Sequence, residues 1–346
     1  MTKNLFIRVD SSNEIGSGHV IRCLALAHAL KHSNVEIFFV CRKLAGHFCD
    51  YIGEKGHNVF ELPNGTTDFQ TDARETIEII ERFSKPIDWL IVDHYNLDAK
   101  WESSVRNHVK QIIVIDDLAD RLHDCDLIVD QNLYNNMEKR YAKLVSDKCI
   151  KLLGPRYALL RPEFKKAKES LRQRDGSLDR ILISFGTTDP TNETLKALEA
   201  ISQMNIKQLR VDVVVGMSNE NKDAIRSICM KNSDTIYHHQ TDNIAELMAK
   251  ADLSIGSGGT TTWERCCVGL PAVVSISAKN QLELTEKVAK EGCVENLGWA
   301  QELTSKDYLK AIKNLNSQTL CRMSQKCLEL VYGEGASRVA DAICSL

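Results

Sequence analysis

The sequence has no long apolar run. No segment reaches the roughly 18 consecutive apolar residues that a membrane-spanning helix needs, and the N-terminal MTKNLFIRVD lacks the apolar stretch and cleavage site of a secretory signal. An excess of charge of one sign is also missing, because 44 lysines and arginines nearly balance 47 aspartates and glutamates, for a net charge of −3. We therefore expect a cytoplasmic protein that binds neither membranes nor nucleic acid.

Metal-binding and disulfide patterns are missing as well. The chain has 12 cysteines but no CxxC pair, and the adjacent Cys266 and Cys267 fall in a predicted helix. The pair His238 and His239 has no third partner at metal-ligand spacing. We interpret most of the cysteines as reduced, buried, small apolar side chains, and we expect neither a metal nor a cofactor.

Short apolar runs alternate with longer segments of helical period along the whole chain. Strand-like runs cover residues 4–9, 35–41, 58–62, 88–93, 111–116 and 126–130 in the first half and 180–185, 211–216, 235–239, 251–256 and 271–276 in the second. Such alternation is typical of βαβ units and parallel sheets. A chain of 346 residues exceeds the size at which one core usually stops growing, so the two series predict two doubly wound α/β domains.

The domain boundaries are indicated by charge and glycine. Residues 163–180 are highly charged and contain Asp175-Gly176, which predicts a solvated helix followed by a linker. The last stretch has helical spacing broken by Gly333 and Gly335, and it could pack on either domain. We expect domains at 1–160 and 178–325 and a C-terminal helical segment at 326–346.

The loop GSGH after the first predicted strand is one candidate for ligand binding, because ligands of open α/β sheets bind at the carboxyl ends of strands. Arg8 and Asp10 end this strand, and Gly16 and Gly18 would let a ligand approach the backbone closely. His19 in the first helical turn could accept a proton. Alternatively, the glycines only form the turn and the histidine caps it. The spacing is not the GxGxxG dinucleotide fingerprint.

The loop SGGTT at residues 257–261 is a second candidate. Its backbone N–H groups and hydroxyls could hold a diphosphate at a helix start, and Glu264, one turn further on, could accept from ribose hydroxyls. The alternative is an ordinary capping box. Two glycines followed by three threonines exceed what a cap requires, which favours ligand binding.

Three further loops follow predicted strands. FGTTDP at 185–190 could close over phosphates or form a plain Asp-Pro turn. In DHYNLDAKWE, at 93–102, Asp93, His94 and Tyr95 would project at the strand end, toward the cleft. Asn280 and Gln281 could bond to sugar hydroxyl or amide groups, or Asn280 could simply cap a helix.

Several of these motifs together resemble one known family. RVDSSNEIGSGHVIRCLALA, VDHYNLDAKWE, IVIDDLADR, CDLIVDQN, LLGPRYALLRPEF and IGSGGTTTWERCCVGLPAV with KNQ are similar to the UDP-sugar hydrolases of pseudaminic acid biosynthesis. Those enzymes remove UDP from UDP-2,4-diacetamido-2,4,6-trideoxy-β-L-altropyranose. The resemblance extends from about residue 5 to about residue 300, and the combination of GSGH with GGTTTWE is more specific than either motif alone.

The resemblance implies a GT-B-like fold, similar to that of the peptidoglycan enzyme MurG, with two Rossmann-like domains and an active site in the interdomain cleft. It also implies that His19 is catalytic and that the C-terminal domain holds the nucleotide, with Glu264 on the ribose. One departure is that the family usually has FGG where this chain has Phe185-Gly186-Thr187. Thr187 is therefore in doubt as a contact made through the backbone alone.

The expected activity is metal-independent hydrolysis of a UDP-sugar, in which water attacks the anomeric carbon with inversion. The free sugar would feed pseudaminic acid synthesis and the glycosylation of flagellin or a surface glycan. The alternatives are a GT-B glycosyltransferase that uses a UDP-sugar donor and a non-catalytic UDP-sugar-binding protein. The sugar stereochemistry and the oligomeric state do not follow from the sequence.

The expected site residues comprise catalytic His19, substrate-binding Arg8, Asp10, Gly16, Gly18, Arg22, Tyr95, Asn280 and Gln281, and UDP-binding Gly186, Ser257, Gly258, Gly259, Thr260, Thr261 and Glu264.

Overall fold

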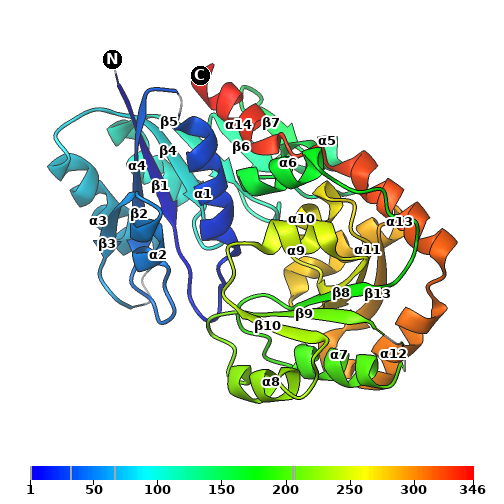
Figure 1. Ribbon diagram of the computed structural model, residues 1–346. Coiled ribbons are helices and arrows are strands. Elements are labelled where there is room, and N and C mark those ends of the chain that lie inside the picture. Colours follow the sequence, from blue (N-terminus) through cyan, green and yellow to red (C-terminus); the bar gives the residue numbers. More distant parts are fainter. Residues whose placement is uncertain (1, 32, 66–67, 205, 207) are drawn as a thin grey trace. The chain divides into compact units, whose positions relative to one another are not determined.

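The chain folds into two compact units, each a parallel sheet with helices packed on it (Figure 1). The computed structural model describes residues 2–31, 33–65, 68–204, 206 and 208–346. The first unit comprises Met1–Arg161 and Glu334–Leu346, and the second comprises Pro162–Gly333. The predicted class, with two doubly wound α/β domains, is confirmed.

The first unit contains a seven-stranded sheet in the order β3-β2-β1-β4-β5-β6-β7, in which every described pair is parallel. Strand β1 is almost entirely buried because helices cover both faces of the sheet, which is why it reads as a continuous apolar run. The strands are β1 (Lys3–Val9), β2 (Val35–Arg42), β3 (Asn58–Leu62), β4 (Ile87–Asp93), β5 (Val109–Ile115), β6 (Leu127–Asp130) and β7 (Ile150–Leu153).

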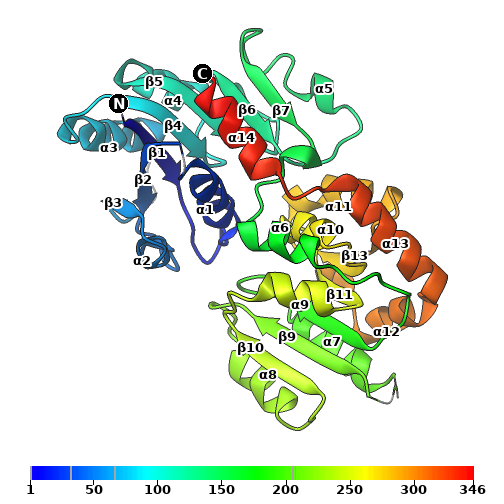
Figure 2. The ribbon, with the colours of Figure 1, turned by 45° about the horizontal axis from the view of Figure 1, so that its top comes forward.

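Alternate side chains of β1 enter two cores on opposite faces of this sheet. Leu5 and Ile7 join a core with α1 and α14, whereas Phe6 packs with Trp101 of α4 and with residues of α3. Helix α14, from the end of the chain, lies beside α1 in both views (Figures 1 and 2). The helices are α1 (Gly18–Leu30), α2 (Cys49–Glu54), α3 (Phe69–Arg82), α4 (Ala99–Val105), α5 (Met137–Arg140) and α14 (Gly335–Cys344), with short 3₁₀ turns η1 (Arg106–His108) and η2 (Pro155–Tyr157).

The second unit contains a six-stranded sheet in the order β10-β9-β8-β11-β12-β13, again with parallel pairs. Its strands are β8 (Arg180–Ser184), β9 (Arg210–Val215), β10 (Thr235–His239), β11 (Leu253–Ser257), β12 (Ala272–Ile276) and β13 (Val294–Trp299). Its helices are α6 (Pro162–Glu169), α7 (Glu193–Ser202), α8 (Lys222–Cys229), α9 (Ile244–Lys250), α10 (Thr261–Cys267), α11 (Leu282–Lys290), α12 (Ser305–Asn314) and α13 (Ser317–Leu330), with 3₁₀ turns η3 (Lys279–Gln281) and η4 (Ala300–Glu302).

Two strands were missed by the pattern of apolar runs, and both lie at a sheet edge. Strand β7 is only four residues long, and β13 carries Glu295, Asn296 and Gly298 among its apolar residues. An edge strand is paired on one side only, and these two are partly exposed, so they need no unbroken apolar run. The strand count of each sheet therefore exceeds the prediction by one.

The predicted linker at 163–180 is instead partly built into the second unit. Its first part forms α6, as expected, and Phe164 of this helix is fully buried. Beyond it, the guanidinium of Arg174 is buried and donates to carbonyls at the C-terminal ends of α9 and α10, among them Ala251 at 3.0 Å and Val268 at 2.6 Å. A cation is favoured at these helix ends, so the charge of this segment partly reflects packing.

The segment 326–346 is divided between the units, because α13 belongs to the second unit and α14 to the first. Apolar side chains of α14, including Val339 and Ile343, are fully buried in the first core. The chain therefore passes from one unit to the other twice. In the part of the chain that the structure describes, no helix has the length and apolar character required to cross a bilayer.

Candidate active site

The GSGH loop leads directly into the first helix. Gly16 has a φ of +78°, a conformation that favours glycine, and its N–H donates to the carbonyl of Ser12 at 2.8 Å. Helix α1 then begins at Gly18, so His19 and Arg22 are three residues apart on one helix face, close to the end of β4.

His19 and Arg22 both bind the carboxylate of Asp93, the last residue of β4. His19 Nδ1 lies 2.5 Å from Asp93 Oδ1, and Arg22 donates to both carboxylate oxygens at 2.6 Å. The side chain of Asp93 has no exposed surface. Burial alone would raise the pKa of the Asp93 carboxyl, but Arg22 and His19 outweigh it and hold the pKa well below its usual range. The carboxylate is therefore charged at neutral pH.

This carboxylate determines how the His19 ring can work. A histidine whose Nδ1 faces a charged carboxylate carries its proton there, which leaves Nε2 to accept another proton. The ring of Tyr95 meets the His19 ring edge-on, with centroids 4.5 Å apart and an interplanar angle of 83°. The two contacts constrain the orientation of the imidazole, as a general base requires.

Acidic residues at the ends of three neighbouring strands extend this group. Arg22 also donates to Asp117, just after β5, at 2.9 Å. Asp130 ends β6, and burial together with the charge of Asp117 raises its pKa to about 7. The sequence analysis singled out Asp93 as a side chain at a strand end, but it assigned no site role to Asp117 or Asp130. The signal is nevertheless present, since DHY, IDD and VDQ each place an aspartate where a strand ends.

Arg8 and Asp10, expected to bind substrate, lie in a buried ion cluster. Arg8 has no exposed surface, and it donates two hydrogen bonds to Asp10 and two to Asp72 of α3, at 2.5 to 3.1 Å. Asp10 also accepts from the Arg42 backbone N–H at 2.7 Å, and it lies 3.2 Å from His94 Nε2. All Arg8 side-chain nitrogens are thus engaged inside the protein, and the cluster fixes the ends of β1, β2 and β4.

In the second unit, the two glycines of the GGTTT loop are packed differently. A Cβ on Gly258 would lie 2.0 Å from Thr285 Oγ1, and the Gly258 N–H donates to the carbonyl of Ser275 at 3.0 Å. A Cβ on Gly259 would lie 3.5 Å from its nearest neighbour, Nε2 of Gln281. Close packing therefore requires glycine at 258, whereas Gly259 has room and lies beside Gln281.

The start of α10 does not have the geometry of a capping box. Thr260 is the residue before the helix and makes no side-chain capping hydrogen bond, and Glu264 is the fourth helical residue. The capping-box alternative for this loop is therefore wrong. Ser257, Thr261 and Glu264 are half-buried. Behind the loop, the buried Arg265 donates to the carbonyl of Ser257 at 2.8 Å.

In the FGTTDP loop after β8, the carboxylate of Asp189 binds backbone N–H groups at the start of the next helix. The Asp189 carboxylate accepts from the backbone N–H groups of Glu193 and Thr194 at 2.8 and 2.9 Å, and so occupies the start of α7. Gly186 has a φ of +86°, and a Cβ on Gly216 would lie 2.4 Å from the Thr187 Cα. The N–H groups of Glu193 and Thr194 are therefore engaged by Asp189, and the assignment of Gly186 to UDP binding stays a prediction.

The structure thus brings the expected residues together in separate groups. His19, Arg22 and Tyr95 meet around Asp93, and Arg8 with Asp10 forms the neighbouring buried cluster. In the second unit Gln281 contacts the loop at Gly259, whereas Asn280 is exposed in the turn η3.

Comparison with solved structures identifies the class of fold. MurG of Acinetobacter baumannii matches 99% of this chain and all of its own with a TM-score of 0.68, at 12% sequence identity. A protein of Arabidopsis thaliana, solved in complex with UDP-L-rhamnose, matches with a TM-score of 0.67 at 10% identity. Together with the two parallel-sheet units, these matches confirm the predicted GT-B-like fold.

Comparison of sequences gives more particular relatives. The model of the glycosyltransferase family 28 C-terminal domain matches residues 181–338. The spore coat polysaccharide biosynthesis protein SpsG of Bacillus subtilis is 25% identical over 98% of this chain and 97% of its own. A UDP-2,4-diacetamido-2,4,6-trideoxy-β-L-altropyranose hydrolase of Campylobacter jejuni is 28% identical over 83% of this chain and 97% of its own. An uncharacterized protein of Methanocaldococcus jannaschii is 29% identical, and the match covers 58% of its length.

Proposed function

We propose that this protein is a UDP-sugar hydrolase that acts in the biosynthesis of a surface polysaccharide or glycoconjugate sugar. The observation that carries the proposal is the hydrogen bond of 2.5 Å between His19 Nδ1 and the buried Asp93 carboxylate, which Arg22 also binds. The relatives support the substrate class, because one of them is named as a hydrolase of a UDP-diacetamido sugar and another as a polysaccharide biosynthesis protein.

The proposed reaction breaks the bond between the anomeric carbon and the oxygen of the UDP diphosphate. His19 Nε2 takes a proton from water while the water oxygen bonds to the anomeric carbon, opposite the departing UDP, so the centre is inverted. Asp93 accepts the Nδ1 hydrogen bond and stabilises the imidazolium that forms. Because UDP leaves as a stable anion, this scheme needs no strong general acid.

The second unit supplies the nucleotide contacts in this proposal. The loop at 257–261 would bind the diphosphate through Gly259, Thr260 and Thr261, which precede or begin α10. Glu264 would accept hydrogen bonds from the ribose hydroxyls. Gly258 packs closely against Thr285, and its N–H is engaged by the carbonyl of Ser275, so it is not assigned a diphosphate contact. In the first unit, Tyr95 would position the sugar, with Asn280 and Gln281 serving the same role from the second.

The proposal is tested by UDP release from UDP-2,4-diacetamido-2,4,6-trideoxy-β-L-altropyranose, with UDP-N-acetylglucosamine as the control substrate. Purified protein is used with a chelator and without any acceptor alcohol. We expect release from the first substrate only, with the free sugar as coproduct and with an inverted anomeric centre by NMR. Binding of the UDP-sugar without any release would contradict the hydrolase and favour a binding protein.

A glycosyltransferase is the second candidate, favoured by the match of residues 181–338 to the glycosyltransferase family 28 C-terminal domain. A transferase would release UDP only when an acceptor alcohol is present. Release that depends on an added acceptor, with no free sugar formed, would decide for the transferase.

The two glycines of the UDP loop provide a matched pair of variants. We expect Gly258→Ala to lower the melting temperature by several degrees, because its Cβ would lie 2.0 Å from a side-chain oxygen of the buried Thr285. Gly259→Ala has room for its Cβ, so it should fold normally and weaken UDP binding about tenfold or more by blocking the approach of the diphosphate. Calorimetry with UDP and thermal melts separate the two effects. Unchanged UDP affinity in Gly259→Ala would remove this glycine from the proposed site.

A further inference from the structure

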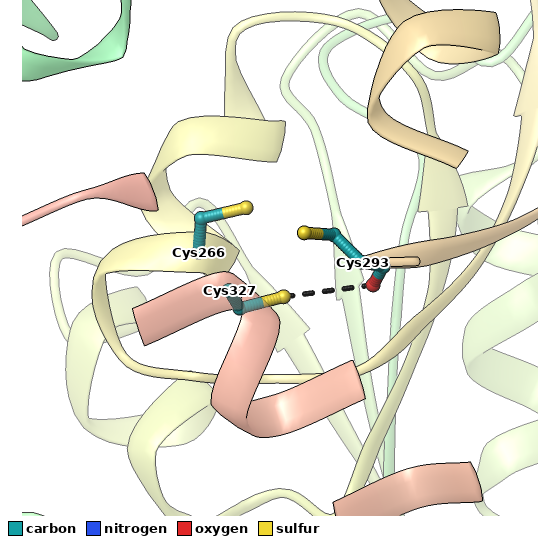
Figure 3. A group of neighbouring side chains, drawn as sticks. All are labelled: Cys266, Cys293 and Cys327. Carbon is teal, nitrogen blue, oxygen red and sulfur yellow. Dashed lines mark hydrogen bonds between the residues drawn. The ribbon is translucent and has the colours of Figure 1, made fainter. Parts of the chain in front are cut away.

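Three cysteine thiols from distant parts of the sequence meet in the core of the second unit. Cys266 comes from α10, Cys293 precedes β13, and Cys327 comes from α13, and their sulfur atoms all lie within 4.8 Å of one another. Figure 3 shows the three side chains converging, with the Cys327 thiol directed at the carbonyl of Cys293, at 3.5 Å. Each residue is at most 1% exposed.

We propose that Cys266, Cys293 and Cys327 form a binding site for a thiophilic d¹⁰ cation, with Cu(I) the best fit and Zn(II) the alternative. Three thiolates are the ligands that such soft cations select. A metal bonded to sulfur at about 2.3 Å holds its sulfur ligands about 3.8–4 Å apart. The thiols therefore need to approach one another by less than about 1 Å.

A buried guanidinium is adjacent to the cluster in sequence. Arg265, next to Cys266 and 1% exposed, donates to the carbonyl of Ser257 and the hydroxyl of Thr262. Its Nε and Nη1 atoms make no hydrogen bond to any described residue. A buried cation with unsatisfied N–H groups is costly, and thiolate charge nearby would offset that cost.

A second buried guanidinium, that of Arg174, is influenced by one of the three thiols. Arg174 is bound only by backbone carbonyls among the described residues, and Asp252 and, more weakly, Cys327 act on it electrostatically. Zn(II) usually takes a fourth ligand, which three cysteines do not supply, so Cu(I) fits the cluster better.

The burial of the cluster determines how it must be loaded. A cation can reach these thiols only while the core is open, so the full-length protein is expressed with added copper or zinc and purified under anaerobic, reducing conditions. After a chelator wash and gel filtration, elemental analysis should find about one metal ion per chain. Copper is expected to be retained in preference to zinc. Less than about a tenth of an ion in both preparations would overturn the proposal.

Matched serine variants test the ligands. Cys293→Ser should lose at least about nine-tenths of the metal, whereas Cys267→Ser should retain it. Cys267 is an ideal control because it is fully buried on the same helix as Cys266, but its thiol is directed at the carbonyl of Phe164. Equal metal content in the two variants would contradict the assignment of the ligands.

A measurement on the unaltered protein keeps the test independent of how the variants fold. X-ray absorption of the metal-loaded protein should show three sulfur neighbours at about 2.3 Å. Nitrogen or oxygen neighbours in their place would overturn the proposal. So would a non-reduced mass lower by two hydrogen atoms with a disulfide mapped among the three cysteines, because two of the ligands would then be consumed.

Discussion

Replacing His19 with asparagine is expected to lower kcat for UDP release by about 10²–10⁴-fold, the usual loss when a general base is removed. KM should change little, because the base acts on the attacking water in the transition state. Asparagine can still donate to Asp93, so the buried carboxylate and Arg22 keep their partners and the fold should persist. Steady-state kinetics with a coupled UDP assay measures the loss, and circular dichroism checks the fold.

His28→Asn is the matched control for this variant, because His28 is exposed in the last turn of the same helix. It should retain wild-type kcat. Wild-type activity in His19→Asn would refute His19 as the base. If the hydrolase proposal itself fails, neither variant will release UDP, so the two failures can be told apart.

Replacing Arg8 with methionine is expected to destabilise the first unit by about 3–5 kcal/mol, because it leaves two buried carboxylates short of their main cation. Arg8 is completely buried and binds Asp10 and Asp72 with two hydrogen bonds each. Hydrogen exchange across a urea series measures the change, since it follows peptides of the first and second units separately. The second unit should be unaffected.

The matched control is Arg74→Met, which removes an exposed arginine of α3 that pairs with Glu78 one turn away. Its expected cost is at most about 0.5 kcal/mol, as for other exposed helical ion pairs. An equal loss of stability in both variants would show that the buried cluster contributes no more to the stability of the first unit than an exposed ion pair does.

The Arg8 variant should also have the opposite dependence on pH. In the wild type, burial raises the pKa of the Asp10 and Asp72 carboxyls, but Arg8 and the other partners outweigh it and lower both. These groups therefore stabilise the native state above their unfolded pKa of about 3.9, and this contribution is lost as the pH falls. Without Arg8, burial still raises the pKa of the Asp10 and Asp72 carboxyls. These two groups therefore take up protons more readily in the folded variant than in its unfolded chain. The loss of unfolding free energy in Arg8→Met, relative to the wild type, should therefore be larger at pH 8 than at pH 5.

Local patterns in the sequence were sufficient for the internal strands. Runs such as RILISF and PAVVSI fall on β8 and β12, because a strand covered on both faces must be apolar throughout. The edge strands β7 and β13 escaped prediction, because one paired neighbour and partial exposure relax that requirement.

The candidate site was predictable only in part for a similar reason. GSGH and DHY could each be found because a glycine-bearing loop and a strand end are local features. The partner of Arg8 on α3, Asp72, could not be found, because nothing in the sequence indicates which helix covers that part of the sheet. The structure also showed that the Asp189 carboxylate accepts from backbone N–H groups at the start of α7, which the sequence had not indicated.

The sequence by itself determined the two series of βα units and the places where loops meet helix starts, since both depend on the period of apolar residues and on glycine. Only the tertiary structure decided that α14 returns to the first unit and that His19 shares Asp93 with Arg22. It alone brought together Cys266, Cys293 and Cys327. Such contacts depend on how distant segments pack on a common sheet, and the spacing of residues along the chain does not determine that packing.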